Sequence, residues 1–134
     1  MTNKICLITP PDTVHTKDYS ILLVYPSTAV KEEFNDITKN LNKSLNVYLY
    51  EPTPDEHDPE WFYNTVSKVD NILVDFDNCP SLIRDIFGYL LSFSKTYWLT
   101  KGEHLYYNKL NMNKIYNLDY LKQTIGGTVE IQSK

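Results

Sequence analysis

Three short runs of almost unbroken apolar sequence most constrain what this chain can fold into. They are Tyr19–Tyr25, Asn46–Tyr50 and Asn71–Asp75. Apolar sequence without polar alternation is typical of a parallel strand that is buried on both faces of its sheet. Each run is followed by a segment with apolar residues at helical spacing, so the chain is predicted to form βαβ units with right-handed crossovers.

Breaker and capping residues mark the remaining elements. Pro26–Thr28 opens a helix, with Ser27 or Thr28 as its N-cap, and that helix is expected to stop near Asn42. Asp58–Glu60 opens a second helix, because it has Asp as N-cap, Pro at the first helical position and Glu in the first turn. Further strands are expected at Lys4–Thr9, Thr96–Leu99 and Lys114–Tyr116, and further helices at Ser81–Phe93 and Leu118–Ile125.

Together these elements predict one α/β domain over residues 1–134, with a three-layer, mostly parallel five-stranded sheet of the flavodoxin-like or Rossmann-like kind. Residues 1–18 are expected to supply an N-terminal edge strand and a loop, since Pro10 and Pro11 cannot continue a ladder. Residues 131–134 are expected to be a frayed tail. In sheets of this kind ligands bind beyond the carboxyl ends of the strands, where the strand order reverses.

Composition narrows the function classes. The net charge is -4 and no segment concentrates Lys and Arg, so no duplex nucleic acid partner is expected. Cys6 and Cys79 do not form a C-x-x-C motif and are expected to be free thiols in a reducing compartment. No apolar run approaches the roughly 20 residues of a membrane span, so a cytoplasmic protein without a membrane partner is expected.

The amino-acid composition offers one hint about the source genome. The chain contains 11 Tyr and many Asn, Lys and Ile residues, which is typical of an AT-rich genome. A phage or a low-GC bacterium fits this bias, and for a phage protein the compartment is the host cytoplasm.

Two of the expected strand ends carry candidate binding groups. After the first buried strand, Ser27 and Thr28 could hold an anion beside the backbone N–H groups of a helix N-terminus, or Ser27 could be a plain N-cap. Neither G-x-G-x-x-G nor a Walker A sequence is present, so no cofactor is expected. The acidic segment Glu51–Asp58 contains the lone His57, with no second His at ligand spacing, and no metal site is expected there.

The third buried strand ends in a group of acids. Asp75 and Asp77 point the same way if the strand persists to Asp77, and Asp85 follows in the next helix beside Arg84. Such carboxylates can share protons, bind sugar hydroxyls or ligate Mg²⁺. Alternatively, Asp77 and Asn78 form an Asx turn and Asp85 only favours the helix N-terminus.

The stretch Val69–Leu99 resembles the central segment of the nucleoside 2-deoxyribosyltransferase-like superfamily. In that family a strand ends in an acidic loop, and a helix with a carboxylate and a glycine leads to a Lys-containing turn. The counterparts here are Asp75, Asp77, Asp85, Gly88 and Lys95. The run Leu22–Pro26 is similar to the family's first strand, whose aromatic residue lies near the sugar. The family nucleophile is a glutamate, and this chain has an aspartate in its place.

The resemblance implies a protein that processes or binds a nucleoside or nucleotide. Asp85 would attack the anomeric carbon, and Asp75 or Asp77 would protonate or orient the base. The expected ligand-binding residues are Tyr25 at the sugar, Arg84 at a phosphate, and Ser27, Thr28, Asn78 and Gly88.

Two other function classes stay open from sequence. One is a noncatalytic binder on the same scaffold, with Tyr106, Tyr107 or Trp98 as recognition residues unless Trp98 is part of the core. The other is a phage accessory or structural protein that acts through protein–protein contacts. In that case the edge strand Lys4–Thr9 would pair with a second copy of the chain or with a phage protein partner.

Overall fold

The computed structural model describes residues 5–10, 12, 19–39, 44–53, 59–80, 89–90, 93–100 and 113–125 of the chain. Several expectations fall outside these residues. They are the roles of Arg84, Asp85 and Gly88, the segment Tyr106–Tyr107, His57, most of the helix expected at Ser81–Phe93, and the tail at residues 131–134.

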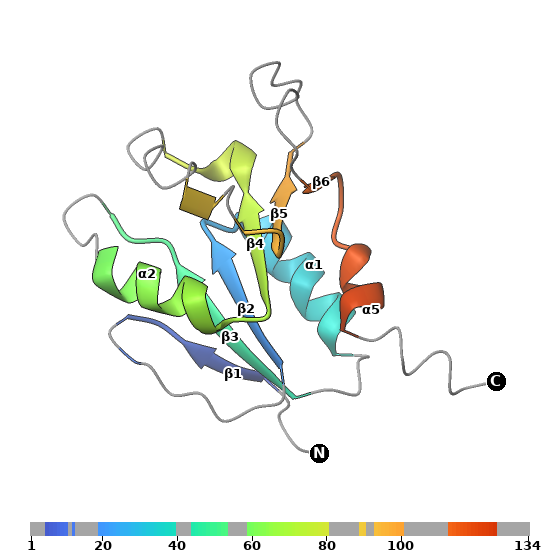
Figure 1. Ribbon diagram of the computed structural model, residues 1–134. Coiled ribbons are helices and arrows are strands. Elements are labelled where there is room, and N and C mark those ends of the chain that lie inside the picture. The colour runs from blue at the N-terminus through green and yellow to red at the C-terminus, as the bar shows by residue number, and fades with distance from the viewer. Residues whose placement is uncertain are drawn as a thin grey trace.

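A parallel sheet forms the middle of the described structure (Figure 1). Its strands are β1 (Ile5–Ile8), β2 (Tyr19–Val24), β3 (Leu45–Tyr50), β4 (Asn71–Asp75), β5 (Thr96–Leu99) and β6 (Asn113–Ile115). They lie in the order β1-β3-β2-β4-β5-β6, and every neighbouring pair is parallel. The predicted α/β class is confirmed, with six strands instead of five, because the expected edge strand β1 continues the main sheet by pairing with β3.

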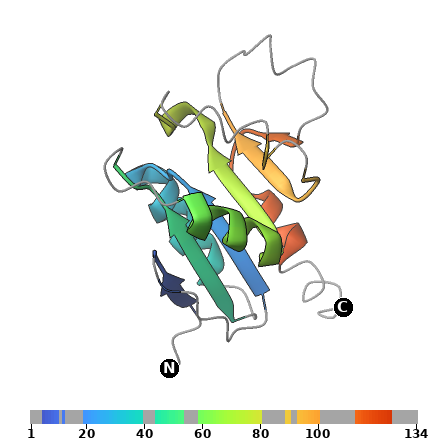
Figure 2. The ribbon, with the colours of Figure 1, turned by 60° about the vertical axis from the view of Figure 1, so that its left-hand side comes forward.

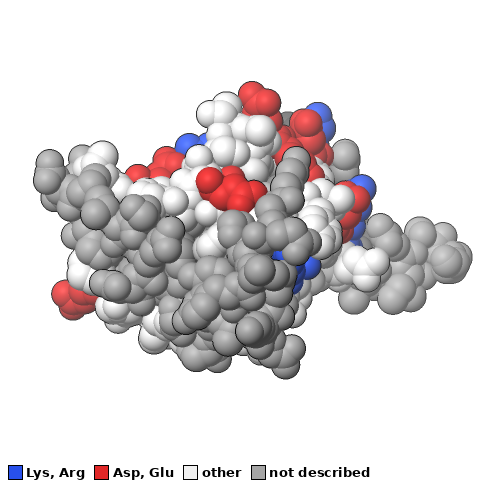
Figure 3. Space-filling model, turned by 90° about the horizontal axis from the view of Figure 1, so that it is seen from above, with Lys and Arg blue, Asp and Glu red and all other residues white. Residues whose placement is uncertain are grey.

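The strand order reverses between β2 and β4. The chain passes from β2 to β3 on one side, then returns across β2 to β4 on the other side. Strands β3-β2-β4-β5-β6 thus reproduce the flavodoxin-like order, in which ligands bind at this reversal. Figure 3 looks down on the carboxyl ends of the strands and shows acidic side chains near the middle of the described surface.

Helices cover both faces of the sheet (Figure 2). Helix α1 (Thr28–Thr38) and helix α5 (Tyr120–Thr124) lie on one face, and the Glu33 carboxylate accepts a hydrogen bond of 3.0 Å from the Leu118 N–H. Helix α2 (Pro59–Lys68) lies on the other face. Helix α1 ends at Thr38, before the expected Asn42, and the Thr38 hydroxyl donates back to the Phe34 carbonyl at 2.8 Å.

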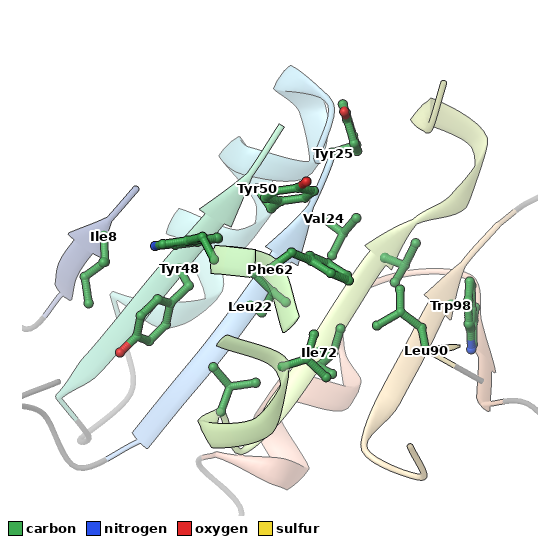
Figure 4. Close-up of a cluster of buried hydrophobic side chains, with 14 residues drawn as sticks. Ile8, Leu22, Val24, Tyr25, Tyr48, Tyr50, Phe62, Ile72, Leu90 and Trp98 are labelled. Atoms are coloured by element: carbon green, nitrogen blue, oxygen red, sulfur yellow. The ribbon is translucent and has the colours of Figure 1, made fainter. Parts of the chain in front are cut away.

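The core consists of one apolar cluster on each face of the sheet. On the α2 side the rings are closely packed, with Tyr50 and Phe62 4.7 Å apart and Tyr50 stacked on Trp61 at 5.8 Å (Figure 4). Trp98 is 1% exposed and belongs to this cluster, so it is a core residue and not a surface recognition residue. Strands β2 and β4 are buried almost throughout, and their carboxyl ends lie side by side where the strand order reverses.

Candidate functional site

Tyr25 forms the first wall of the site at the end of β2. Its φ is 51°, and among the described residues no other non-glycine residue has a positive φ. This left-handed conformation costs about 1–2 kcal/mol, so surrounding contacts must impose it. Three hydrogen bonds do so: the Tyr25 N–H donates to the Tyr50 carbonyl at 2.9 Å, the Tyr25 hydroxyl donates to the Pro52 carbonyl at 2.6 Å, and the Tyr25 carbonyl accepts from Asn78 Nδ2 at 2.8 Å.

Asp75 links the end of β4 to the start of α1. Its side chain is 6% exposed, and its Oδ2 accepts a 2.9 Å hydrogen bond from the Ser27 N–H. The Ser27 hydroxyl in turn accepts from the Val30 N–H at 3.2 Å, which confirms Ser27 as the N-cap of α1. Two donors at the start of α1 are therefore satisfied by the protein itself.

Asp77 points in a different direction from Asp75. Strand β4 ends at Asp75, and Phe76–Asn78 forms a 3-10 turn, so the alternation of a strand does not reach Asp77. The exposed Asp77 accepts a 2.7 Å hydrogen bond at Oδ1 from the Thr100 hydroxyl, just past the end of β5. Asp75 thus contacts the segment after β2, whereas Asp77 contacts the segment after β5.

Cys79 follows these groups in the loop after β4 and feels the charge of both carboxylates. Burial, followed by the negative charges of Asp75 and Asp77, raises the pKa of the Cys79 thiol from 9.0 to about 12. Burial also raises the pKa of Tyr25, and Cys79 and then Glu51 add to that shift. The mutual influence places Cys79 within electrostatic reach of both carboxylates and of Tyr25. With this pKa the thiol stays protonated at neutral pH and is not a nucleophile.

A groove of about 330 Å³ borders the site on the β3 side. Its lining residues are Thr9, Pro10, Leu49, Glu51 and Pro52, at the carboxyl ends of β1 and β3. The hydrogen bond from the Tyr25 hydroxyl to the carbonyl of Pro52, a lining residue, links the groove to the end of β2. Glu51 is also fixed, because it forms an ion pair of 3.1 Å with Lys31 of α1.

The structure brings together five of the residues expected from sequence. They are Tyr25, Ser27, Asp75, Asp77 and Asn78. Thr28 is exposed in the first turn of α1, and Asp85, Arg84 and Gly88 lie outside the described residues. Sequence reasoning missed Cys79 and Thr100 as parts of the site. The only signal for them is that Thr100 directly follows the expected strand Thr96–Leu99 and that Cys79 lies in the turn after the expected strand Asn71–Asp75.

Two features are not found among the described residues. No three His, Cys, Asp or Glu side chains among them are grouped so that they could hold a metal ion. In the same part of the chain, no helix has the length and apolar character needed to cross a membrane. The site contains the carboxylates of Asp75 and Asp77, the amide of Asn78, the protonated thiol of Cys79 and the ring of Tyr25.

In comparisons with known proteins, no family model, no curated protein and no solved structure matches the chain. The fold and the site define the class as an α/β protein with a flavodoxin-like strand order and an acidic loop at its reversal point.

Proposed function

We propose that this chain binds a nucleoside where the strand order reverses between β2 and β4, and that it processes the N-glycosidic bond. One observation carries the proposal: Tyr25 from β2 and Asp75 from β4 lie at the reversal point, where the contacts of Ser27 and Asn78 link the two strand ends, and Asp77 follows two residues after Asp75. Carboxylates at such a place can accept hydrogen bonds from sugar hydroxyls and from the N–H groups of a base.

The contacts of each residue suggest its part in binding. Asp77 is exposed and accepts a hydrogen bond from the Thr100 hydroxyl, so its carboxylate would bind a hydroxyl group of the ligand by the same kind of contact. The Tyr25 hydroxyl is engaged with Pro52, and its ring is 8% exposed. Tyr25 would therefore shape the wall beside the sugar, and Asn78 would hold that wall in place.

The reaction would follow the resemblance to the deoxyribosyltransferase-like superfamily. A carboxylate, assigned by that resemblance to Asp85, attacks the anomeric carbon, so that a C–O ester bond forms as the C–N glycosidic bond breaks. The base leaves with a proton from Asp75 or Asp77. Water or a second base then attacks the same carbon, releases the Asp85 carboxylate and returns the proton to the loop carboxylate.

Base exchange tests this function directly. The protein is incubated with 2′-deoxynucleosides and a different free base, and released and newly formed compounds are separated by liquid chromatography. We expect turnover in the wild type, loss of turnover with retained binding in Asp85→Ala, and unchanged turnover in Asp36→Ala. Asp36 is a matched control because it is an exposed aspartate near the other end of α1. Absence of turnover in the wild type would refute processing of the bond, and absence of nucleoside binding as well would refute the whole proposal.

A second candidate is a noncatalytic accessory protein that acts through contacts with another copy or with a phage protein. The observation in its favour is an apolar groove of about 240 Å³ between β1, β3 and α1, in which Leu7 is 62% exposed. Under this function Leu7→Asp would weaken an assembly detected by light scattering and leave the stability of the monomer unchanged. A monomeric wild type at all concentrations, together with base exchange, would exclude it.

A further inference from the structure

The groove of about 330 Å³ at the carboxyl ends of β1 and β3 has fixed walls. Its volume is at the lower end of the range of small-molecule sites, roughly 300–1,000 Å³. On the β1 side the Asp12 N–H donates to the Thr9 carbonyl at 2.8 Å, and Trp61 Nε1 donates to the Asp12 carbonyl at 2.7 Å. On the β3 side the Tyr25 hydroxyl donates to the Pro52 carbonyl at 2.6 Å. Both walls are therefore in place without a ligand, which lowers the cost of binding one.

The lining of this groove is better suited to accept hydrogen bonds than to donate them. Pro10 and Pro52 have no backbone N–H group, and together with Leu49 they supply apolar surface. The charged lining residue is Glu51, and an ionised carboxylate only accepts hydrogen bonds. Such a groove suits a mostly apolar group that carries hydrogen-bond donors at one edge.

Glu51 already accepts from a nitrogen donor in this position. Its Oε2 contacts the Lys31 ammonium group of α1 at 3.1 Å, and the Glu51 side chain is 37% exposed. The contact orients the carboxylate at the edge of the groove and uses one of its two oxygens. Because a carboxylate has about four acceptor sites, Glu51 can accept a further N–H group from a ligand without losing Lys31.

The groove lies within the length of a nucleoside from the loop after β4. Strand β3 pairs with β2, with Tyr50 opposite Val24, and β2 pairs with β4, with Val24 opposite Val74. Neighbouring strands are roughly 4.8 Å apart, so the ends of β3 and β4 are about 10 Å apart. A base in the groove and a sugar at the end of β4 would span this distance, with Tyr25 at the end of the strand between them.

We propose that this groove is the base subsite and that Glu51 is its specificity-determining residue, so that bases with an exocyclic amino group, such as adenine and cytosine, are preferred. The proposal rests on the proposed function and names the class of base in its substrate. A carboxylate can accept from such an amino group, as Glu and Asp accept from cytosine N4 in DNA recognition. Hypoxanthine and uracil have a carbonyl oxygen at that position, which would face the carboxylate without a proton between them. Loss of one hydrogen bond to a charged acceptor predicts a preference of about tenfold for the amino base.

Matched pairs in which a carbonyl oxygen replaces the amino group test the proposal. Binding of 2′-deoxyadenosine is compared with that of 2′-deoxyinosine, and 2′-deoxycytidine with 2′-deoxyuridine, by NMR titration of the Leu49 and Glu51 amide signals. In the wild type both signals should shift and saturate, with dissociation constants about tenfold lower for the amino members. Glu51→Gln should remove most of this preference, because an amide can also donate to a carbonyl oxygen. Glu60→Gln, which removes an exposed carboxylate from α2 on the other face of the sheet, should leave the preference unchanged.

Equal affinity within both pairs, an unchanged preference in Glu51→Gln, or Leu49 and Glu51 signals that none of these compounds moves would overturn the proposal. Free adenine and free hypoxanthine separate this failure from that of the proposed function. If free adenine binds at the two signals more tightly than hypoxanthine and no nucleoside is turned over, the groove takes amino bases as argued and the proposed function alone fails. If nucleosides are turned over without a preference for the amino base, the proposed function remains and the base subsite is wrong.

Discussion

The reactivity of Cys79 reports the burial of its thiol and, to a smaller degree, the negative charges of Asp75 and Asp77. Its pKa of about 12, against 9.0 for an ordinary thiol, is a difference of about three pH units. At pH 8 the thiolate is therefore about 1,000-fold scarcer in the folded protein than in the unfolded chain, and alkylation should slow by up to about the same factor, because a thiolate of higher pKa is more nucleophilic. Burial is the largest cause of the shift, followed by Asp75 and then Asp77.

The assay uses a Cys6→Ser variant, in which Cys79 is the remaining thiol of the two in the chain. Iodoacetamide incorporation is measured by mass spectrometry in the native protein and in urea. Adding Asp77→Asn should speed alkylation, because one negative charge is removed, but the rate should stay well below that in urea because burial persists. A native rate within about tenfold of the rate in urea would refute the burial of Cys79, and an unchanged native rate in the Asp77→Asn variant would refute the effect of that carboxylate on the thiol.

Three further predictions concern stability. The unfolded chain loses the Cys79 proton near pH 9.0 and the native protein only near pH 12. The free energy of unfolding should therefore decrease as the pH rises from 9.0 to about 12. In urea titrations at several pH values, Cys79→Ala should make this decrease with pH less steep. Tyr25→Phe removes the 2.6 Å hydrogen bond to the Pro52 carbonyl and should lower the free energy of unfolding, measured in urea, by about 1 kcal/mol. A decrease below roughly 0.3 kcal/mol would contradict a stabilising role for this hydrogen bond. Ser27→Ala removes the N-cap of α1 and should also cost about 1 kcal/mol, whereas Thr28→Ala, at the exposed neighbour, should change thermal stability little in calorimetry.

Local sequence signals are sufficient to predict where most strands of the sheet begin and end. The expected ranges Asn71–Asp75 and Thr96–Leu99 coincide with β4 and β5, because polar residues or turns bound short apolar runs. The edge position of β1 was predicted from Pro10 for the same local reason. The number of strands was predicted less well, since whether β1 joins the main sheet depends on its pairing with β3, which is a long-range contact.

The direction of the site side chains could not be predicted from sequence. The Phe76 ring packs edge-on against Trp98 at 6.1 Å, and the chain turns at Phe76–Asn78 instead of continuing as a strand. That turn sends Asp77 to Thr100 while Asp75 binds Ser27. Both outcomes depend on contacts between segments that are distant in the sequence.

The positive φ of Tyr25 has a similar explanation. A sequence rule would expect Gly or Asn in a left-handed position, because a side chain with a Cβ atom is strained there. Here the conformation is imposed by Tyr50, Pro52 and Asn78, which come from β3 and from the loops after β3 and β4. Strain held by distant partners at a reversal point is typical of functional sites.

An NMR titration of the wild-type protein with a 2′-deoxynucleoside tests the central proposal most directly. If a nucleoside binds between β2 and β4, the amide signals of Ser27, Asp77 and Asn78 should shift together and saturate with one dissociation constant. Signals that stay unmoved at these three residues, or shifts confined to the groove around Leu7, would contradict a nucleoside site between β2 and β4.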